Sequence, residues 1–494
     1  MYYQTIGRKI MSKQHKISPN TWLTVLLFGF CGQVAWVIEN NYFNVFMDRT
    51  ITHDPFAIAL MVAASAVVAT FVTLIAGTWS DKLGNRRSLM SYGYIIWGVI
   101  IISFSFIKVE YVQDLFKCSR ETAQTVCVAV VVVMDCVMTL FGSTSNDAAY
   151  NAWVTDNTTP KNRGTLEGVI AVMPLFAMAV VFGLFDEMTK NYYELGGEIV
   201  RTWSEGAVRT GYGEWTKFYC ILGGFVILVG IVGIFTVKDS PNLKPNPSVS
   251  FKDMFYGAKK EVVKANKNLY LCYLTLMFVG IANNCFMSYL FIYLEKTLGY
   301  TNYIIPVGII MVTAAIGSVV FGIGIDKFSD RRKPLFFLVG AYVVGAVLML
   351  LASPLTFKSG TPLWAVCIGG FVLMAANLCI SANVTAMVRD LTPPDKAGQF
   401  QGVRMFFWVL VPMCVGPMLT AIITKVSATS PAVDEFGEVV TVYSPYMFLL
   451  SAIIALLSIV PIVFLMKAKS EEMKPFEAAE NSEITDDVLP EQTV

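Results

Sequence analysis

The chain has 494 residues, of which 55% are hydrophobic and only 15% are charged. Soluble domains carry about 25% charged residues, so this composition excludes an ordinary soluble fold and indicates a membrane protein. The net charge of +1 provides no field that would recruit nucleic acid, and we expect no nucleic-acid partner. The two histidines and ten singly spaced cysteines form no metal-ligand pattern, so we expect no metal site.

Twelve apolar runs are long enough to cross a bilayer as helices. They lie near residues 21–46, 55–79, 88–108, 128–154, 165–185, 216–237, 269–295, 301–323, 334–353, 363–387, 399–424 and 445–467. Most Lys and Arg residues fall on one side when both termini are placed in the cytoplasm, as the positive-inside rule requires. We therefore expect an all-α, multi-pass protein of the plasma membrane with both termini cytoplasmic.

The spacing of the runs divides the chain into two halves. We expect a cytoplasmic tail over 1–20, a six-helix bundle over 21–237, a cytoplasmic linker over 238–268, a second six-helix bundle over 269–468 and a disordered acidic tail over 469–494. The linker is rich in lysine and proline, and the last segment is acidic and poor in aromatic residues.

Two inner loops occur twice, which indicates an internal duplication. The loop Gly77-Thr-Trp-Ser-Asp81-Lys-Leu-Gly-Asn-Arg86-Arg87 matches Gly322-Ile-Gly-Ile-Asp326-Lys-Phe-Ser-Asp-Arg331-Arg332 at an offset of 245. A second loop, Asp156 to Gly164 with Arg163, matches Asp390 to Gly398 at an offset of 234. Two six-helix halves related in this way are the plan of a transporter with its site between them.

The repeated loop resembles the best-known signature of the major facilitator superfamily. That resemblance implies two pseudo-symmetric six-helix bundles working by alternating access. It also implies that the loop residues form the inner gates. The residues concerned are Gly77, Asp81, Arg86, Arg87, Asp156, Arg163, Gly322, Asp326, Arg331, Arg332 and Asp390.

Three carboxylates interrupt apolar runs of the first half, namely Glu39, Asp135 and Asp147. Charged groups inside a membrane cost free energy and usually mark function, so we expect these three to couple transport to a cation. Helical spacing places further polar residues beside them, as a stripe facing a water-filled cavity. The substrate-binding residues that we expect in the first half are Gln33, Trp36, Asn40, Asn44, Ser143, Asn146, Tyr150 and Asn151.

The second half offers amides and hydroxyls at Asn284, Ser288, Asn377 and Ser381, and we expect no buried charge there. Because no Lys or Arg is expected within a span, a carboxylate or phosphate substrate would lack a counter-charge. A neutral sugar or an organic cation suits such a lining better. The coupling ion is left open between H⁺ and Na⁺, and we expect no other cofactor.

The segment from Asp147 to Arg163 resembles the glycoside–pentoside–hexuronide cation symporters, and Gly32-Gln33 to Glu39 looks like the sucrose-type transporters. Both resemblances imply import of a sugar or glycoside with a cation, and they make Asp147 the first choice for coupling. The alternative is a proton-coupled exporter of drugs or organic cations. No enzyme motif is present, so we expect a transporter and not an enzyme. We also expect it to be a monomer that lies in the lipid bilayer and binds a small-molecule substrate.

Overall fold

Local sequence explains where several helices begin and end. The helix α2 (Pro19–Val37) starts at Ser18, whose side chain accepts a hydrogen bond from the Thr21 amide. The helix α4 (Pro55–Leu83) starts in the same way at Asp54 and stops at Gly84, whose φ of 59° is left-handed. Short polar side chains before a proline, and a glycine after the last turn, are typical helix boundaries.

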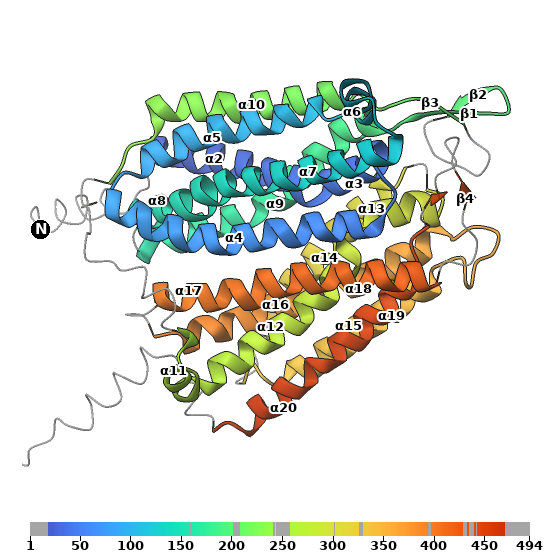
Figure 1. The fold of residues 1–494 in the computed structure, drawn as a ribbon. Coiled ribbons are helices and arrows are strands. Elements are labelled where there is room, and N and C mark those ends of the chain that lie inside the picture. The colour runs from blue at the N-terminus through green and yellow to red at the C-terminus, as the bar shows by residue number, and fades with distance from the viewer. Residues whose placement is uncertain are drawn as a thin grey trace, which may run out of the picture. The chain divides into compact units, whose positions relative to one another are not determined.

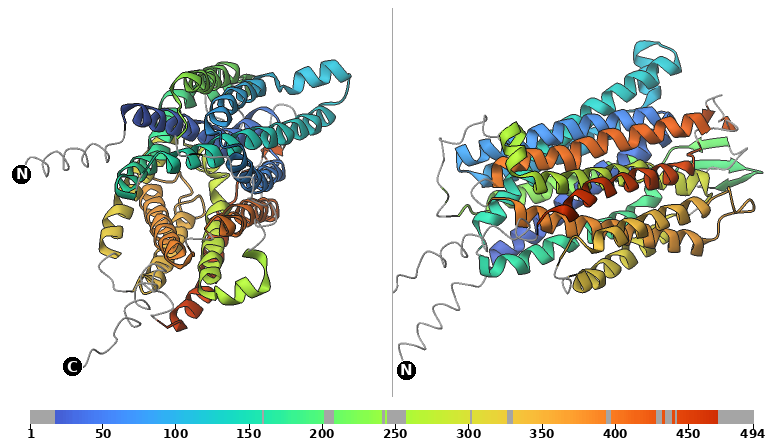
Figure 2. Two further views of the ribbon diagram at one scale, coloured as in Figure 1. Left: turned by 90° about the vertical axis from the view of Figure 1, so that its left-hand side faces the viewer. Right: turned by 90° about the horizontal axis from the view of Figure 1, so that it is seen from below.

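The computed structural model describes residues 18–158, 160–200, 208–240, 243, 257–300, 302–325, 330–393, 397–427, 432–433, 439–440 and 442–469. Within them the chain forms two units. The first comprises Met1–Ser250, Ser288–Ile304 and Ala428–Val442, and the second comprises Phe251–Met287, Ile305–Ser427 and Tyr443–Val494. In each unit, taken by itself, the long helices run beside one another (Figures 1 and 2).

The first unit contains six long helical spans. Its helices are α2, α3 (Phe43–Thr50), α4, α5 (Arg86–Ser103), α6 (Val109–Phe116), α7 (Arg120–Gly142), α8 (Asn151–Asp156), α9 (Pro160–Thr189), α10 (Trp215–Thr236) and α13 (Leu290–Ile292). The π-helical turns Ile38–Tyr42 and Ser143–Tyr150 join α2 to α3 and α7 to α8, so that each of these two spans is continuous. Another π-helical turn, Tyr293–Thr297, follows α13.

The second unit contains the remaining spans. Its helices are α11 (Lys260–Ala265), α12 (Lys267–Met287), α14 (Ile304–Ile325), α15 (Pro334–Leu351), α16 (Leu363–Leu391), α17 (Ala397–Met405), α18 (Val411–Ser427), α19 (Tyr446–Leu457) and α20 (Ile459–Lys467). A π-helical turn, Phe406–Leu410, joins α17 to α18.

The two units repeat the same helix contacts. In the first, α2 packs on α9 and α10, and α5 packs on α10. In the second, α12 packs on α18 and α19, and α15 packs on α19. Counted by span, these are contacts of the first helix of each half with the fifth and sixth, and of the third with the sixth. The internal duplication seen in the sequence is therefore also present in the packing.

Glycine allows α5 and α10 to approach closely. A Cβ atom on Gly98 would lie 2.5 Å from the backbone oxygen of Gly223, and one on Gly223 would lie 2.7 Å from the oxygen of Gly98. Both distances are shorter than van der Waals contact, so no side chain fits at this crossing. Small residues at helix crossings favour membrane packing because backbones can then touch.

Two small sheets lie outside the spans. The strands β1 (Tyr192–Leu195), β2 (Glu198–Val200) and β3 (Val208–Gly211) form an antiparallel sheet in the order β2-β1-β3. Gly196 and Gly197 have positive φ values and make the tight turn between β1 and β2. The strands β4 (Ala432–Val433) and β5 (Val439–Val440) form a second antiparallel pair.

The expected twelve-helix architecture is confirmed. Eleven helices of the described residues are long and apolar enough to cross a membrane, and Ile304–Val320 is a shorter apolar helix at the expected eighth span. The helix α6 and the three-stranded sheet were not expected from the sequence. Residues 1–17 and 470–494 of the two predicted terminal tails, and residues 241–242 and 244–256 of the predicted linker, lie outside the described residues.

Candidate functional site

Two carboxylates meet inside the first unit. Glu39 lies in the π-helical turn after α2, and Asp135 lies in α7; their exposed fractions are 7% and 1%. The Thr139 hydroxyl donates to Oε1 of Glu39 at 2.8 Å, and Ser65 of α4 lies beside Asp135. Three spans, the first, second and fourth, therefore converge on this pair.

The carboxylate pair is incompletely satisfied. Oε2 of Glu39 and Oδ1 of Asp135 are buried without a hydrogen-bond partner among the described residues. Within the same part of the chain, neither carboxylate forms an ion pair with a basic side chain. Two neighbouring anions in a low-dielectric interior repel each other, so the site suits a bound proton or cation.

Four residues from three spans form a hydrogen-bonded chain beside the pair. Nε1 of Trp36 donates to Oδ1 of Asn146 at 3.2 Å, and Nδ2 of Asn146 donates to the Tyr94 hydroxyl at 2.6 Å. That hydroxyl donates in turn to the carbonyl oxygen of Phe28 at 2.9 Å. The Trp97 ring packs edge-on against both Trp36 and Tyr94. Sequence reasoning missed Tyr94 and Trp97 because nothing in the sequence shows which face of the third span turns toward the first and fourth.

The polar residues of the fourth span do not share one environment. Asp135, Thr139 and Ser143 are each at most 1% exposed, so this part of the predicted stripe packs inside the unit and does not face open water. Asp147 is half-buried beside the Ser143 hydroxyl, and Asn151 is exposed. The reason is the π-helical turn Ser143–Tyr150, which shifts the register that a regular α-helix would have kept.

Other expected binding residues of the first half have internal partners. The Tyr150 hydroxyl is buried and donates to the carbonyl oxygen of Val25 at 3.1 Å. Nδ2 of Asn44 donates to the carbonyl oxygen of Asn40, and Oδ1 of Asn44 is buried without a hydrogen-bond partner among the described residues. Asn40 is exposed and Gln33 is half-buried.

The expected residues of the second half lie on two helices and one junction. Asn284 is half-buried on α12, and its amide donates to the carbonyl oxygen of Gly280 at 2.9 Å. Asn377 and Ser381 are half-buried on α16. Ser288 follows α12, is 9% exposed, and belongs to the first unit. The roles of all four remain predictions.

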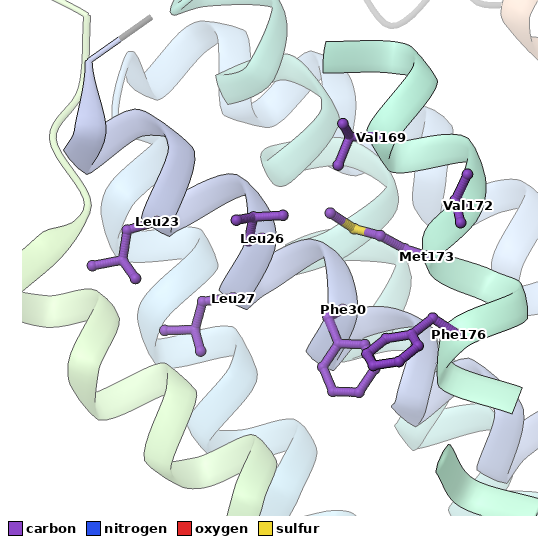
Figure 3. A pocket seen from close by; sticks show the side chains of 8 residues that line it. All are labelled: Leu23, Leu26, Leu27, Phe30, Val169, Val172, Met173 and Phe176. Atoms are coloured by element: carbon purple, nitrogen blue, oxygen red, sulfur yellow. The ribbon is translucent and has the colours of Figure 1, made fainter. Parts of the chain in front are cut away.

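An apolar groove lies between α2 and α9 (Figure 3). Its volume is about 600 Å³. Its lining residues are Leu23, Leu26, Leu27 and Phe30 of α2 and Val169, Val172, Met173 and Phe176 of α9. The groove has no polar side chain to hydrogen-bond a hydroxyl group, so it suits hydrocarbon chains and is not the candidate polar site.

The sequence and the fold were compared with known proteins. The Major Facilitator Superfamily profile matches residues 21–359 and 341–488. The chain belongs to the major facilitator superfamily. No curated protein matches the sequence.

Solved structures of transporters share this superfamily's fold with the chain. The nucleoside transporter NupG has 11% identity and a TM-score of 0.65, covering 90% of this chain and 99% of its own. A bacterial homologue of the human lysosomal transporter Spinster, in an inward-facing and occupied conformation, has 14% identity and a TM-score of 0.60. That match covers 92% of this chain and 98% of the homologue. These structures show the fold, whereas membership of the superfamily makes the chain a multi-pass transporter and not an enzyme, as the sequence predicted.

The superfamily motif of the first half holds two inner loops together. Nε of Arg86 donates to Oδ2 of Asp156 at 3.2 Å, and Nη1 of Arg86 donates to the Ser80 hydroxyl at 2.5 Å. The guanidinium of Arg87 donates to the carbonyl oxygen of Ile234. Gly77 lies in α4, whereas the side chains of Asp81 and Arg163 lie outside the described part of the structure.

The motif of the second half uses an acid that was not expected. Nε and Nη2 of Arg332 both donate to the Asp330 carboxylate, at distances from 2.8 to 3.1 Å. Nη1 of Arg332 donates to the carbonyl oxygen of Leu465 at 2.9 Å. The backbone oxygen of Arg331 accepts from Asn383 at 2.8 Å. Gly322 lies in α14, Asp390 is half-buried near the end of α16, and Asp326 lies outside the described residues.

Two expectations about charge were wrong. Glu295 and Lys296 of the second half are 7% and 9% exposed, so buried charge is not confined to the first half. Basic side chains also occur within spans, because Arg49 ends the first span and the half-buried Arg404 lies in the span Gly402–Ser427. The argument against anionic substrates therefore no longer holds.

Proposed function

We propose that this transporter is a cation-coupled symporter that imports a sugar or glycoside by alternating access. The observation that carries the proposal is the buried pair of Glu39 and Asp135 inside the first unit. A site of this kind can bind a proton or Na⁺ and release it when the transporter opens to the other side of the membrane. The reason is that burying the two carboxylates costs little free energy only when their charge is neutralised.

The structure supports a different coupling residue from the one first chosen. Asp147 is half-buried, whereas Glu39 and Asp135 are buried, joined through Thr139 and without an ion-pair partner among the described residues. We propose that Glu39 and Asp135 carry the coupling cation. Asp147 then lies on the path between this pair and the water on the inner side.

The lining beside the pair suits a hydroxyl-rich solute. Trp36 is half-buried, and the exposed Asn40 lies one helical turn after it. An aromatic ring beside an amide offers both an apolar face and hydrogen-bonding groups, which is how sugar rings are commonly held. NupG is named as a nucleoside transporter, and a nucleoside is a glycoside of ribose, so nucleosides belong among the substrates to be tested.

The test is uptake into proteoliposomes. Labelled neutral glycosides, nucleosides and acidic sugars are offered under an imposed proton gradient, an imposed sodium gradient or no gradient. We expect one class to accumulate only with a gradient. The variants Glu39→Gln and Asp135→Asn should abolish accumulation and retain exchange of internal for external substrate.

The matched control is Glu121→Gln, which removes an exposed carboxylate from the first turn of α7. Its accumulation should equal that of the wild type. Gradient-independent uptake, or full accumulation by both variants of the pair, would refute the coupling proposal. If only lipophilic cations moved, and outward against a proton gradient, the exporter alternative would replace it.

A further inference from the structure

An acid followed by a base occurs at the end of the first span of each half. Asp48-Arg49 ends the first span, and Glu295-Lys296 lies in the continuation of the seventh span at an offset of 247. Both dipeptides fall on the side that the positive-inside rule assigns to the outside. No signature loop of the superfamily includes either of them.

The structure pairs the two dipeptides crosswise. Nη2 of Arg49 lies 2.6 Å from Oε2 of Glu295, and Nζ of Lys296 lies 2.6 Å from Oδ2 of Asp48. The exposed fractions of the four residues are between 1% and 9%. All four belong to the first unit, because Ser288–Ile304 packs with the first-half helices. We call these four residues the outer ion-pair cluster.

The cluster is held by neighbours from the other outer segments. Arg49 also donates to the Thr189 hydroxyl at 2.8 Å and to the Tyr303 hydroxyl at 3.2 Å. The Tyr303 hydroxyl donates to Asp186 at the end of α9. Nδ1 of His53 lies 3.3 Å from Asp48 and 3.1 Å from Lys296, and so contacts both members of one ion pair.

Reciprocal pairing follows from the duplication. Where two equivalent segments meet, each presents the same acid and base, so the acid of one faces the base of the other, as in an isologous interface. Buried ion pairs add little net stability, yet breaking one leaves an uncompensated buried charge. Two pairs on adjacent residues should therefore form and break together, which suits an element with two discrete states.

We propose that the outer ion-pair cluster is a gate contact that joins the outer ends of the first and seventh spans and opens as a unit. This inference rests on the proposed alternating access. The gate contact requires no particular substrate or coupling ion, so it does not depend on the proposed sugar symport. The inner signature loops and this outer contact then act on opposite sides of the membrane.

The test is hydrogen–deuterium exchange of the purified full chain in lipid nanodiscs, followed by mass spectrometry. In the wild type, Phe43–Thr50 and Tyr293–Thr297 should become exchangeable at one common opening rate. The variants Arg49→Glu and Glu295→Arg should each raise that rate in both segments by about tenfold or more, because each buries two like charges. The double variant, with the charges swapped, should return the rate to near the wild-type value.

A control and a milder series complete the design. Lys217→Glu reverses an exposed charge that pairs with Glu214 at 3.0 Å, and it should leave both segments unchanged. If the charge reversals do not fold, Arg49→Gln and Glu295→Gln serve instead, and the double variant should then be less impaired than the sum of the singles. Independent exchange rates in the two segments, or no rescue by the swap, would overturn the proposal. Because exchange requires no transport, a failed uptake assay would refute only the proposed substrate and coupling.

Discussion

Arg87 and Arg332 occupy equivalent positions of the internal repeat, and each donates from its guanidinium to a carbonyl in the last turn of the sixth span of its own half. Arg87 reaches Ile234 in α10, and Arg332 reaches Leu465 in α20. The last carbonyls of a helix lack partners within it, and a cation there also interacts favourably with the helix dipole. The signature arginine therefore has a structural task within each half, besides any part in gating.

Replacing Arg332 should destabilise the second unit. In Arg332→Gln the Leu465 and Ala468 carbonyls and the Asp330 carboxylate lose their buried donor, and the expected loss is about 1–3 kcal/mol of unfolding free energy. The measurement is thermal unfolding of the detergent-purified protein followed by tryptophan fluorescence. The control is Lys333→Gln at the adjacent, exposed position, which should unfold like the wild type. Equal unfolding temperatures for both variants would contradict this account.

The Asp330–Arg332 contact should also give a pH dependence. Hydrogen bonds from Arg332 lower the pKa of the Asp330 carboxyl below its ordinary value of 3.8. A lowered pKa in the folded state adds stability above the unfolded-state pKa, and this contribution is lost as the pH falls through the folded-state pKa. The wild type should thus be more stable than Asp330→Asn at about pH 7, and the difference should shrink as the pH falls below about 4. A difference that stayed constant down to about pH 3 would show that the carboxylate charge is not the cause.

Tyr94 is the middle member of the hydrogen-bonded chain in the first unit. Tyr94→Phe removes the hydroxyl that accepts from Asn146 and donates to the Phe28 carbonyl, and both partners would remain buried. We expect a loss of about 1–3 kcal/mol in unfolding free energy. The control is Tyr92→Phe, two residues earlier on α5, where the side chain is 56% exposed. Unfolding in denaturant should separate the two variants, and the chain would be unimportant for stability if they unfolded alike.

The architecture could be predicted because it depends on properties that are local in the sequence. Apolar runs, basic inner loops and repeated motifs identified all twelve spans and the duplication. Some predicted spans ended several residues too early, so residues that belong to a helix were assigned to a loop. The first span continues to Thr50, so Asp48 and Arg49 belong to a helix and not to a loop.

The site was predicted only in part, because it depends on contacts between distant segments. The three carboxylates are visible in the sequence, since charges in apolar runs are rare. Their neighbours Thr139 and Ser65 are ordinary hydroxyl residues among many, and only the fold brings these two beside the carboxylates. The π-helical turn Ser143–Tyr150 also cannot be read from hydrophobic spacing, and it changes which residues face inward. The cross-pairing of Asp48-Arg49 with Glu295-Lys296 had one visible signal, namely the repeated acid–base dipeptide.

Two neighbouring glycines of α10 provide a test of the helix packing. A Cβ atom on Gly223 would lie 2.7 Å from the backbone oxygen of Gly98, whereas one on Gly224 would meet nothing within 4 Å. Gly223→Ala should therefore force α5 and α10 apart and cost about 1–3 kcal/mol, as overpacking does. Gly224→Ala should be neutral or stabilising by up to about 1 kcal/mol, because alanine loses less backbone entropy in a helix. Both variants add the same methyl group to the same helix, so a difference between their unfolding temperatures reports the close approach alone. If Gly223→Ala were as stable as Gly224→Ala, the two backbones could not be in contact at this crossing.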